Sequence, residues 1–252
     1  MTEQIPVSIE LDGVSKVYPG GVSAVDGIDL SIAGGRVTAL LGPTGCGKTT
    51  ILRMVGGLVD ATSGVMTSSK PDPVIGYCFQ EPRLLPWRTV ERNVGLPLEL
   101  QGVDSETRRK AVASVLQLVG LADAADRLPA ALSGGMRMRA SLARALVSNP
   151  ELLLLDEPFG ALDEVTRYRL DEEVAQLVRR TAMTVLLVTH SITEAVLLAD
   201  EVVVLSPQPC RIVERYEVDF DHRNAELRGR PEFTALVARV YDSLRSAMGD
   251  SE

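Results

Sequence analysis

A glycine-rich segment at residues 42–49 has the residue types and the spacing that bind phosphate groups. The segment reads Gly42, Pro43, Thr44, Gly45, Cys46, Gly47, Lys48 and Thr49, with Thr50 directly after it. Glycines let the backbone curl inward, so that successive N–H groups point at phosphate oxygens where a Cβ would clash. Lys48 supplies a positive charge for the β- and γ-phosphates of a nucleotide, and the Thr49 hydroxyl can reach a bound Mg²⁺. We therefore expect this segment, called the phosphate loop below, to bind ATP.

The residues on either side of the phosphate loop support this interpretation. Residues 36–41 predict a buried strand and residues 50–55 predict a helix. The phosphates would then lie at the N-terminus of that helix, where unpaired N–H groups and the helix dipole favour anions. A glycine-rich turn that contains Lys-Thr by chance would not need this strand–loop–helix context.

A second apolar run, residues 152–155, ends in two acidic residues, Asp156 and Glu157. We expect Asp156 to hold Mg²⁺ through water, because Mg²⁺ keeps much of its hydration shell. Glu157 lies one residue further on, where it can polarise the water that attacks the γ-phosphate. A kinase-like transferase would also need an acceptor pocket, for which the sequence offers no obvious candidate. The predicted chemistry is phosphoryl transfer from ATP to water.

His190 follows a third apolar run, residues 184–189. A lone histidine after a strand is usually structural, but the carboxyl ends of parallel strands meet at one edge of a sheet. His190 would therefore lie at the same edge as Glu157. There its imidazole can bond the γ-phosphate or position the attacking water and Glu157.

A third motif consists of Ser133, Gly134 and Gly135. Ser133 predicts an N-cap for a helix over residues 136–147, and the two glycines permit close approach of the backbone. This is a second anion-binding helix start in a chain with one phosphate loop. The economical solution is a two-fold dimer in which each Ser-Gly-Gly motif covers the ATP held by the other subunit. An ordinary capped helix would show the same residues.

The composition excludes several classes of protein. The 252 residues suit one large domain with a subdomain. A net charge of −8 means that the chain lacks the excess of basic residues expected of a nucleic-acid-binding protein. Three cysteines without metal-ligand spacing predict a reducing compartment and no disulfide framework. The apolar runs are shorter than the ~20 residues that span a bilayer, and the first residues do not resemble a signal peptide. We expect a soluble cytoplasmic protein.

Strand-like and helix-like segments alternate after residue 150, which predicts a parallel sheet covered by helices. Residues 81–131 are expected to form a helical insertion in this α/β core. An apolar stripe over residues 231–248 predicts a C-terminal helix. Docking of that helix on its own domain is the simplest account, and binding to a partner is the alternative.

Together these motifs resemble the nucleotide-binding subunits of ATP-binding cassette (ABC) transporters over nearly the whole chain, residues 1–252. The resemblance implies an α/β fold with the P-loop NTPase core of an ABC ATPase, an antiparallel β subdomain and an inserted α-helical subdomain. It also implies roles for single residues. Tyr18 matches the aromatic residue that stacks on adenine, and Gln80 matches the glutamine that links Mg²⁺ and the attacking water to the helical subdomain. Asp163 lies in a segment that resembles the loop communicating across the dimer, and His190 matches the switch histidine.

Residues 81–90, the Leu-Ser-Gly-Gly-Met segment at 132–136 and residues 158–163 resemble importers for nitrate, taurine and aliphatic sulfonates. The segment 132–136, called the signature segment below, ends in Met136 where glutamine is commonest, and Met138 also replaces a glutamine. The resemblance implies a homodimer or a paired ABC subunit at the cytoplasmic face of the membrane. It further implies a transmembrane permease and an extracytoplasmic solute-binding protein. A soluble ABC ATPase in cofactor assembly, repair or translation is the alternative.

Two residues keep alternative interpretations. Trp87 is either part of the groove that receives a permease helix in this family or a buried residue of the helical subdomain. Cys46 in the phosphate loop is either a reactive thiol, because helix N-termini lower thiol pKa values, or merely a small residue that fits.

Overall fold

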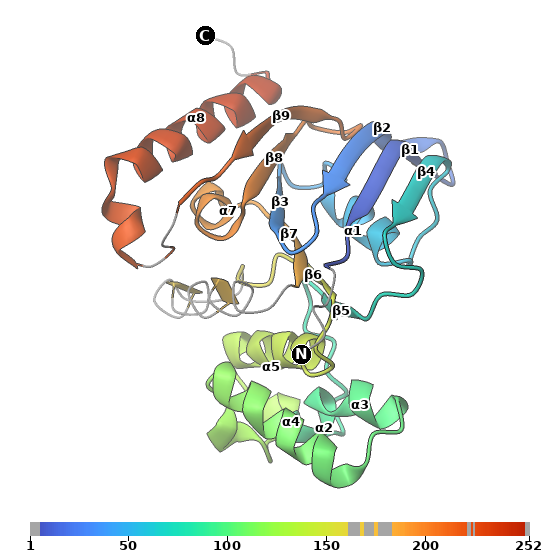
Figure 1. Cartoon of the computed structure of the whole chain (residues 1–252), viewed down its shortest axis with the longest axis vertical. Coiled ribbons are helices and arrows are strands. Elements are labelled where there is room, and N and C mark those ends of the chain that lie inside the picture. Colours follow the sequence, from blue (N-terminus) through green and yellow to red (C-terminus); the bar gives the residue numbers. More distant parts are fainter. Residues whose placement is uncertain are drawn as a thin grey trace.

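The computed structural model describes residues 6–160, 167–168, 174–175, 183–220, 223 and 225–249. These residues form a small antiparallel sheet, a larger sheet and a group of helices that extends away from both sheets (Figure 1). Asp163 lies outside the described residues.

The small sheet contains β1 (Ile9–Tyr18), β2 (Val22–Ile32) and β4 (Ser63–Ser68) in the order β2-β1-β4. All its pairs are antiparallel. Burial alternates along β2, because successive side chains point to opposite faces of a strand. One face therefore packs into the core and the other faces solvent. This sheet matches the expected antiparallel β subdomain.

The larger sheet has the order β5-β6-β7-β3-β8-β9. Its parallel strands are β5 (Ile75–Cys78), β6 (Leu152–Asp156), β7 (Thr184–Thr189), β3 (Val37–Leu41) and β8 (Glu201–Leu205). The central strands are buried on both faces, which explains their continuous apolar runs. The expected parallel sheet needs one correction, because β9 (Ile212–Glu217) pairs with β8 in the antiparallel direction.

Helices cover the larger sheet on both faces (Figure 1). They are α1 (Lys48–Val55), α7 (Ile192–Leu198) and α8 (Pro231–Ala247). The C-terminal helix α8 packs on its own domain, as the simplest account of its apolar stripe predicts. Phe233 and Val240 are buried, and the Tyr216 hydroxyl on β9 donates to the carbonyl oxygen of Arg239 at 3.2 Å.

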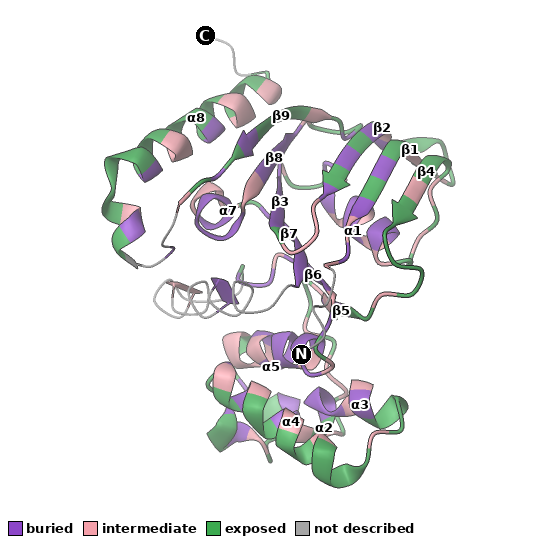
Figure 2. Ribbon diagram, viewed as in Figure 1, coloured by how far each residue is buried: buried purple, intermediate pink, exposed green. Residues whose placement is uncertain are grey.

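A separate group of helices lies beyond β5 and β6 (Figures 1 and 2). It comprises α2 (Val90–Val94), α3 (Leu96–Leu100), α4 (Ser105–Leu118) and α5 (Gly134–Leu146). Helix α5 contacts α2 and α4 on one side and β5 on the other. It therefore connects this helical group to the larger sheet. No helix among the described residues is long and apolar enough to cross a membrane.

Asn93 fixes the chain segment that enters this helical group. Its side chain is fully buried, and its Oδ1 accepts from the backbone N–H of Leu85 at 2.7 Å. Its Nδ2 donates to the carbonyl oxygens of Leu85, Arg88 and Thr89 at 2.9–3.1 Å. One amide thus holds residues 85–89 in place.

Replacing Asn93 by alanine would leave two partly buried backbone groups, the Leu85 N–H and the Arg88 carbonyl oxygen, without these partners. We expect the free energy of unfolding to fall by about 3 kcal/mol, as is usual when buried polar groups lose their hydrogen bonds. Urea unfolding followed by circular dichroism measures this change. Gln117→Ala, on the exposed face of α4, is the control and is expected to change stability by less than about 0.5 kcal/mol. Equal effects of the two variants would contradict the role given to Asn93.

Candidate functional site

The phosphate loop connects the end of β3 to the start of α1, as predicted. Gly45 and Gly47 have φ values of 79° and 126°, a region that favours glycine. A Cβ on Gly47 would lie 2.5 Å from the carbonyl oxygen of Ala24. Glycine at this position is therefore required by both backbone conformation and space.

Lys48 is held at the base of the phosphate loop. Its Nζ donates to the carbonyl oxygens of Gly42 at 2.7 Å and Pro43 at 2.8 Å, and the residue is only 4% exposed. A buried ammonium group needs such partners because removing a charge from water is costly. These bonds keep the cation beside the N–H groups that open α1, so the loop combines fixed positive charge with several donors.

Thr49 and Asp156 bring two oxygen atoms together below the loop. The Thr49 hydroxyl donates to Oδ1 of Asp156 at 2.8 Å. Asp156 ends β6 and is 2% exposed, and burial raises the pKa of its carboxyl group, against the lowering effects of the Thr49 hydrogen bond and Arg53. Hydroxyl and carboxylate oxygens are the ligand types that Mg²⁺ prefers. The two residues thus fit a magnesium site.

Two predicted residues, Gln80 and His190, converge on the carboxylate of a third, Glu157. Oε2 of Glu157 lies 3.3 Å from Nε2 of Gln80 and 3.2 Å from Nδ1 of His190. Gln80 follows β5, Glu157 follows β6 and His190 follows β7. The carboxyl ends of these neighbouring parallel strands meet at one edge, which explains why residues far apart in sequence become neighbours.

Glu157 has an unusual backbone conformation, with φ at 46°. A non-glycine residue rarely adopts this conformation, which commonly occurs where a side chain must be aimed at a functional site. The Glu157 N–H donates to the carbonyl oxygen of Val188 at 2.9 Å, and Gly160 donates to the Glu157 carbonyl oxygen at 3.3 Å. These bonds fix the backbone turn at Glu157, directly after β6, and with it the position of the carboxylate.

Tyr18 also lies close to the phosphate loop. Its hydroxyl is 3.4 Å from the hydroxyl of Thr50 in α1, and Nζ of Lys16 lies 5.4 Å from its ring centroid. The small sheet therefore brings an aromatic ring beside the phosphate loop, where an adenine ring can stack.

The signature segment lies at the start of α5, in the helical group. The Ser133 hydroxyl accepts from the Met136 N–H at 3.2 Å, which confirms Ser133 as the N-cap. Ser133 and Gly134 are exposed, and Gly135 is partly exposed. Over the described part of the chain, no hydrogen bond or ion pair links these three residues to residues 42–50. The structure does not bring the signature segment to the phosphate loop of the same chain.

The two methionines of the signature region have different environments. Met138 is 2% exposed, and its Sδ lies 3.9 Å from the Sγ of Cys78. A glutamine there would need partners for its amide, so methionine suits this apolar contact between α5 and β5. Met136 packs partly against the same core cluster.

Arg144 joins α5 to the segment that follows Gln80, a contact that the sequence does not predict. Its guanidinium donates to the carbonyl oxygens of Pro82 at 2.9 Å and Arg83 at 2.8 Å. The helix that begins with the signature segment is thereby bonded to the strand end that carries Gln80.

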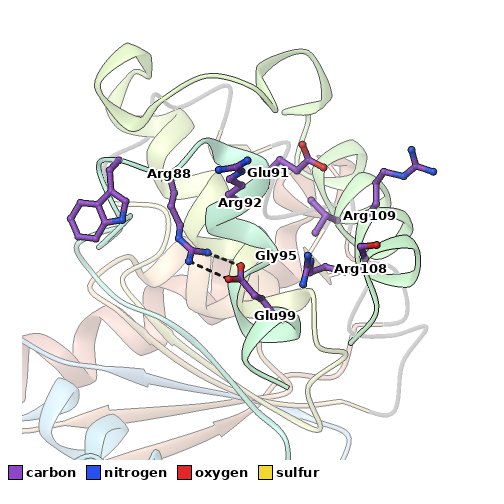
Figure 3. Close-up of a pocket in the computed structure, with 10 residues that line it drawn as sticks. Arg88, Glu91, Arg92, Gly95, Glu99, Arg108 and Arg109 are labelled. Carbon is purple, nitrogen blue, oxygen red and sulfur yellow. Dashed lines mark hydrogen bonds and ion pairs between the residues drawn. The ribbon is translucent and has the colours of Figure 1, made fainter. Parts of the chain in front are cut away.

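Trp87 is 73% exposed, so the alternative of a buried tryptophan is wrong. It lines an open pocket of about 650 Å³ on the helical group. Figure 3 shows the Arg88–Glu99 ion pair, at 2.7 Å, among the residues that line this pocket. Four arginines contribute to the pocket: Arg88, Arg92, Arg108 and Arg109.

Comparison with known proteins agrees with this arrangement. A family model described as "ABC transporter" matches residues 25–160. The taurine import ATP-binding protein TauB of Yersinia pestis bv. Antiqua is 44% identical over 235 residues, covering 89% of this chain and 91% of the relative.

The chain belongs to the ABC transporter family. TauB of Escherichia coli O6:K15:H31 is 40% identical over 246 residues, covering 91% of this chain and 96% of that protein. Among solved structures, the dimeric ABC transporter cassette MJ0796 gives a TM-score of 0.77 at 30% identity, over 84% of this chain and 99% of that chain. The findings confirm the predicted fold class and the prediction of an ATPase subunit of an ABC importer.

Proposed function

We propose that this ATPase subunit drives the import of taurine or a similar small sulfonate through a separate permease. The observation that carries the proposal is the 40–44% identity to taurine import ATP-binding proteins over about nine-tenths of the chain. The convergence of Gln80 and His190 on Glu157 supports it, because a carboxylate held by two polar partners argues for an active motor. A soluble ABC ATPase is the less favoured alternative.

In this proposal the phosphate loop binds ATP. Backbone N–H groups of residues 42–49 and the first turn of α1 donate to the phosphates, and the ammonium group of Lys48 neutralises charge on the γ-phosphate. Tyr18 stacks on the adenine. Thr49, Asp156 and Gln80 would hold Mg²⁺, whose chemical contribution is to neutralise charge on the β- and γ-phosphate oxygens.

Glu157 acts as the general base. Its carboxylate accepts a proton from the water that attacks the γ-phosphorus. The bond between the γ-phosphorus and the bridging oxygen breaks, and ADP is the leaving group. Gln80 donates to the carboxylate and orients the attacking water. His190 contacts the same oxygen at 3.2 Å, where it can hold the carboxylate and bond the γ-phosphate. Positioning and charge neutralisation therefore supply the catalysis.

The second half of the site comes from another subunit in this proposal. Exposed Ser133 and Gly134 begin a helix that, among the described residues, has no hydrogen bond or ion pair to the chain's own phosphate loop, and the similar MJ0796 cassette is a dimer. Two copies, or one copy and a related subunit, would place each signature segment over the ATP of the other. Asp163, which lies outside the described residues, is assigned to communication across this interface by resemblance.

The open pocket around Trp87 would receive a cytoplasmic segment of the permease. An exposed indole within an open, arginine-rich pocket suits a short amphipathic helix with an acidic residue. Peripheral attachment by this contact would place the subunit at the cytoplasmic face of the membrane. A solute-binding protein on the other side would deliver the solute.

Replacing Trp87 by alanine is expected to weaken assembly with the permease about thirtyfold, because exposed tryptophans at interface centres contribute about 2 kcal/mol or more. The amount of permease retained by the immobilised subunit from detergent extracts measures this effect. Tyr241→Ala, which removes another exposed aromatic ring from α8, is the matched control. Equal retention by both variants would contradict the docking role.

The proposed function is tested by reconstitution. The subunit, the permease encoded beside it and the corresponding solute-binding protein are placed in proteoliposomes, and uptake of labelled taurine, an aliphatic sulfonate and nitrate is compared. We expect ATP-dependent uptake of taurine or the sulfonate. ATP hydrolysis without uptake of any of the three would reject the proposed solute class. Failure to assemble with a membrane protein would favour the soluble alternative.

A further inference from the structure

Two cysteines that are far apart in sequence meet beneath the phosphate loop. Cys46 lies in the loop, and Cys210 lies between β8 and β9. Both side chains are buried, at 1% and 0% exposure, and belong to the same core cluster. A Cβ on Gly47, the residue after Cys46, would lie 2.9 Å from the Cβ of Cys210. The described cysteines therefore include one pair whose side chains lie close together.

The backbone around Cys210 holds this thiol against the loop. Its N–H donates to the carbonyl oxygen of Ala24 at 3.0 Å, and its carbonyl oxygen accepts from Asp26 at 3.0 Å. A Cβ built on Gly47 would lie 2.9 Å from the Cβ of Cys210. Cys210 is thus fixed by β2 on one side and packed against the loop backbone on the other.

The two thiols have unlike electrostatic environments. Nζ of Lys48 lies 4.0 Å from the Sγ of Cys46. The hydrogen bond from Cys210 lowers the pKa of the Cys46 thiol most, and the charge of Lys48 lowers it further, against the effect of burial. The same contact raises the pKa of Cys210. Cys46 therefore has thiolate character and Cys210 remains its proton donor.

We propose that Cys46 and Cys210 form a reversible disulfide that switches off ATP hydrolysis by displacing the phosphate loop. The oxidant is a hydroperoxide. The Cys46 sulfur attacks the peroxide and the O–O bond breaks. With hydrogen peroxide, the products of this step are a sulfenic acid on Cys46 and one water. The Cys210 sulfur then attacks that sulfur, the S–O bond breaks, and a second water leaves with the Cys210 proton. Two thiols lose two electrons in total, which reduce one peroxide to two waters.

The disulfide would alter the loop at the residues that bind phosphate. Two free thiols must approach to an S–S distance of ~2.05 Å to form the bond, so Cys46 has to move relative to the fixed Cys210. The N–H groups of Cys46 and Gly47 and the side chain of Lys48 move with it. Displacement of catalytic groups by about 1 Å can lower a rate about a hundredfold. This step rests on the proposed assignment of residues 42–49 as the phosphate loop.

Peptide mapping tests the disulfide independently of activity. The three cysteines fall in three tryptic peptides, at residues 37–48, 54–83 and 181–211, because Lys70 precedes proline. The full chain is treated with hydrogen peroxide, a probe small enough for a thiol that is 1% exposed. Free thiols are then blocked and the digest is analysed without reduction. We expect peptide 37–48 linked to peptide 181–211 with the loss of two hydrogens.

ATP hydrolysis is measured on the same samples. We expect about a hundredfold loss for the oxidised wild type, restored by dithiothreitol. Each variant is compared with its own untreated rate. Cys210→Ser should keep its rate under peroxide, whereas Cys78→Ala should lose activity as the wild type does. Cys78 is the matched control because it is fully buried near Ser141, and burial raises the pKa of its thiol to about 11.

The other outcomes overturn the proposal. Absence of the linked peptides, a link to peptide 54–83, or a link between two copies of peptide 37–48 would each reject the Cys46–Cys210 bond. The correct link with unchanged hydrolysis would reject the switch. If the untreated protein hydrolyses no ATP, the catalytic assignment fails, while the peptide map still decides whether the disulfide forms.

Discussion

Replacing Glu157 by glutamine is expected to lower the rate of ATP hydrolysis by about 10²–10⁴-fold, the usual contribution of a general base. Glutamine keeps the shape of the side chain but cannot accept the proton of the attacking water. The contacts of Oε2 with Gln80 and His190 remain sterically possible. ATP binding should persist, since the phosphate loop is unchanged, and the variant should accumulate as an ATP-bound dimer.

Phosphate release measures this effect, and size-exclusion chromatography with ATP measures the dimer. Glu232→Gln, at an exposed position at the start of α8, makes the same chemical change away from the site and should hydrolyse ATP at the wild-type rate. Near-normal turnover by Glu157→Gln would refute the assignment of Glu157 as the base. A trapped variant of this kind also offers a stable bait for the permease.

The second large effect is expected for Gly135→Asp. In the proposed dimer the signature segment approaches the γ-phosphate held by the other subunit, so a carboxylate there repels the nucleotide and removes the close backbone approach. We expect hydrolysis to fall about a hundredfold or more, as on removing a stabilising group at a charged transition state. ATP binding to the variant's own phosphate loop should change little.

Fluorescent-nucleotide titration separates binding from turnover in this variant. Gly229→Asp adds the same charge at an exposed glycine whose Cβ would meet open space, and it serves as the control. Normal hydrolysis by Gly135→Asp would contradict the shared site. Equal loss in both variants would show a general effect of added negative charge.

The sequence predicts the central strands well because burial on both faces produces continuous apolar runs. Residues 152–155 and 184–189 are such runs, and they form β6 and β7. Strand β9 is different, since it lies at the sheet edge and four of its six residues are exposed. Its sequence is rich in charged residues and lacks the continuous apolar run of the central strands, although Ser206-Pro207 and Pro209 before it favour a turn.

The site residues also divide into those that the sequence predicts and those that it does not. The phosphate loop and the Asp156–Glu157 pair are contiguous, so residue order alone indicates their chemistry. The meeting of Gln80 and His190 at Glu157 follows from the parallel strand order and could be expected at an edge, though not at 3.2–3.3 Å. The contacts of Arg144 and Cys210 have no local pattern, because they arise only when distant segments pack.

The dependence of specific activity on protein concentration tests the central claim, that each hydrolytic site is completed by a second subunit. At concentrations where the purified chain is monomeric by mass photometry, ATP turnover per chain should fall in proportion to dilution. It should reach a plateau only when dimers dominate. The account would be contradicted if ATP turnover per chain stayed constant across protein concentrations at which only monomers are present, and if replacing Ser133 caused no loss of ATP hydrolysis.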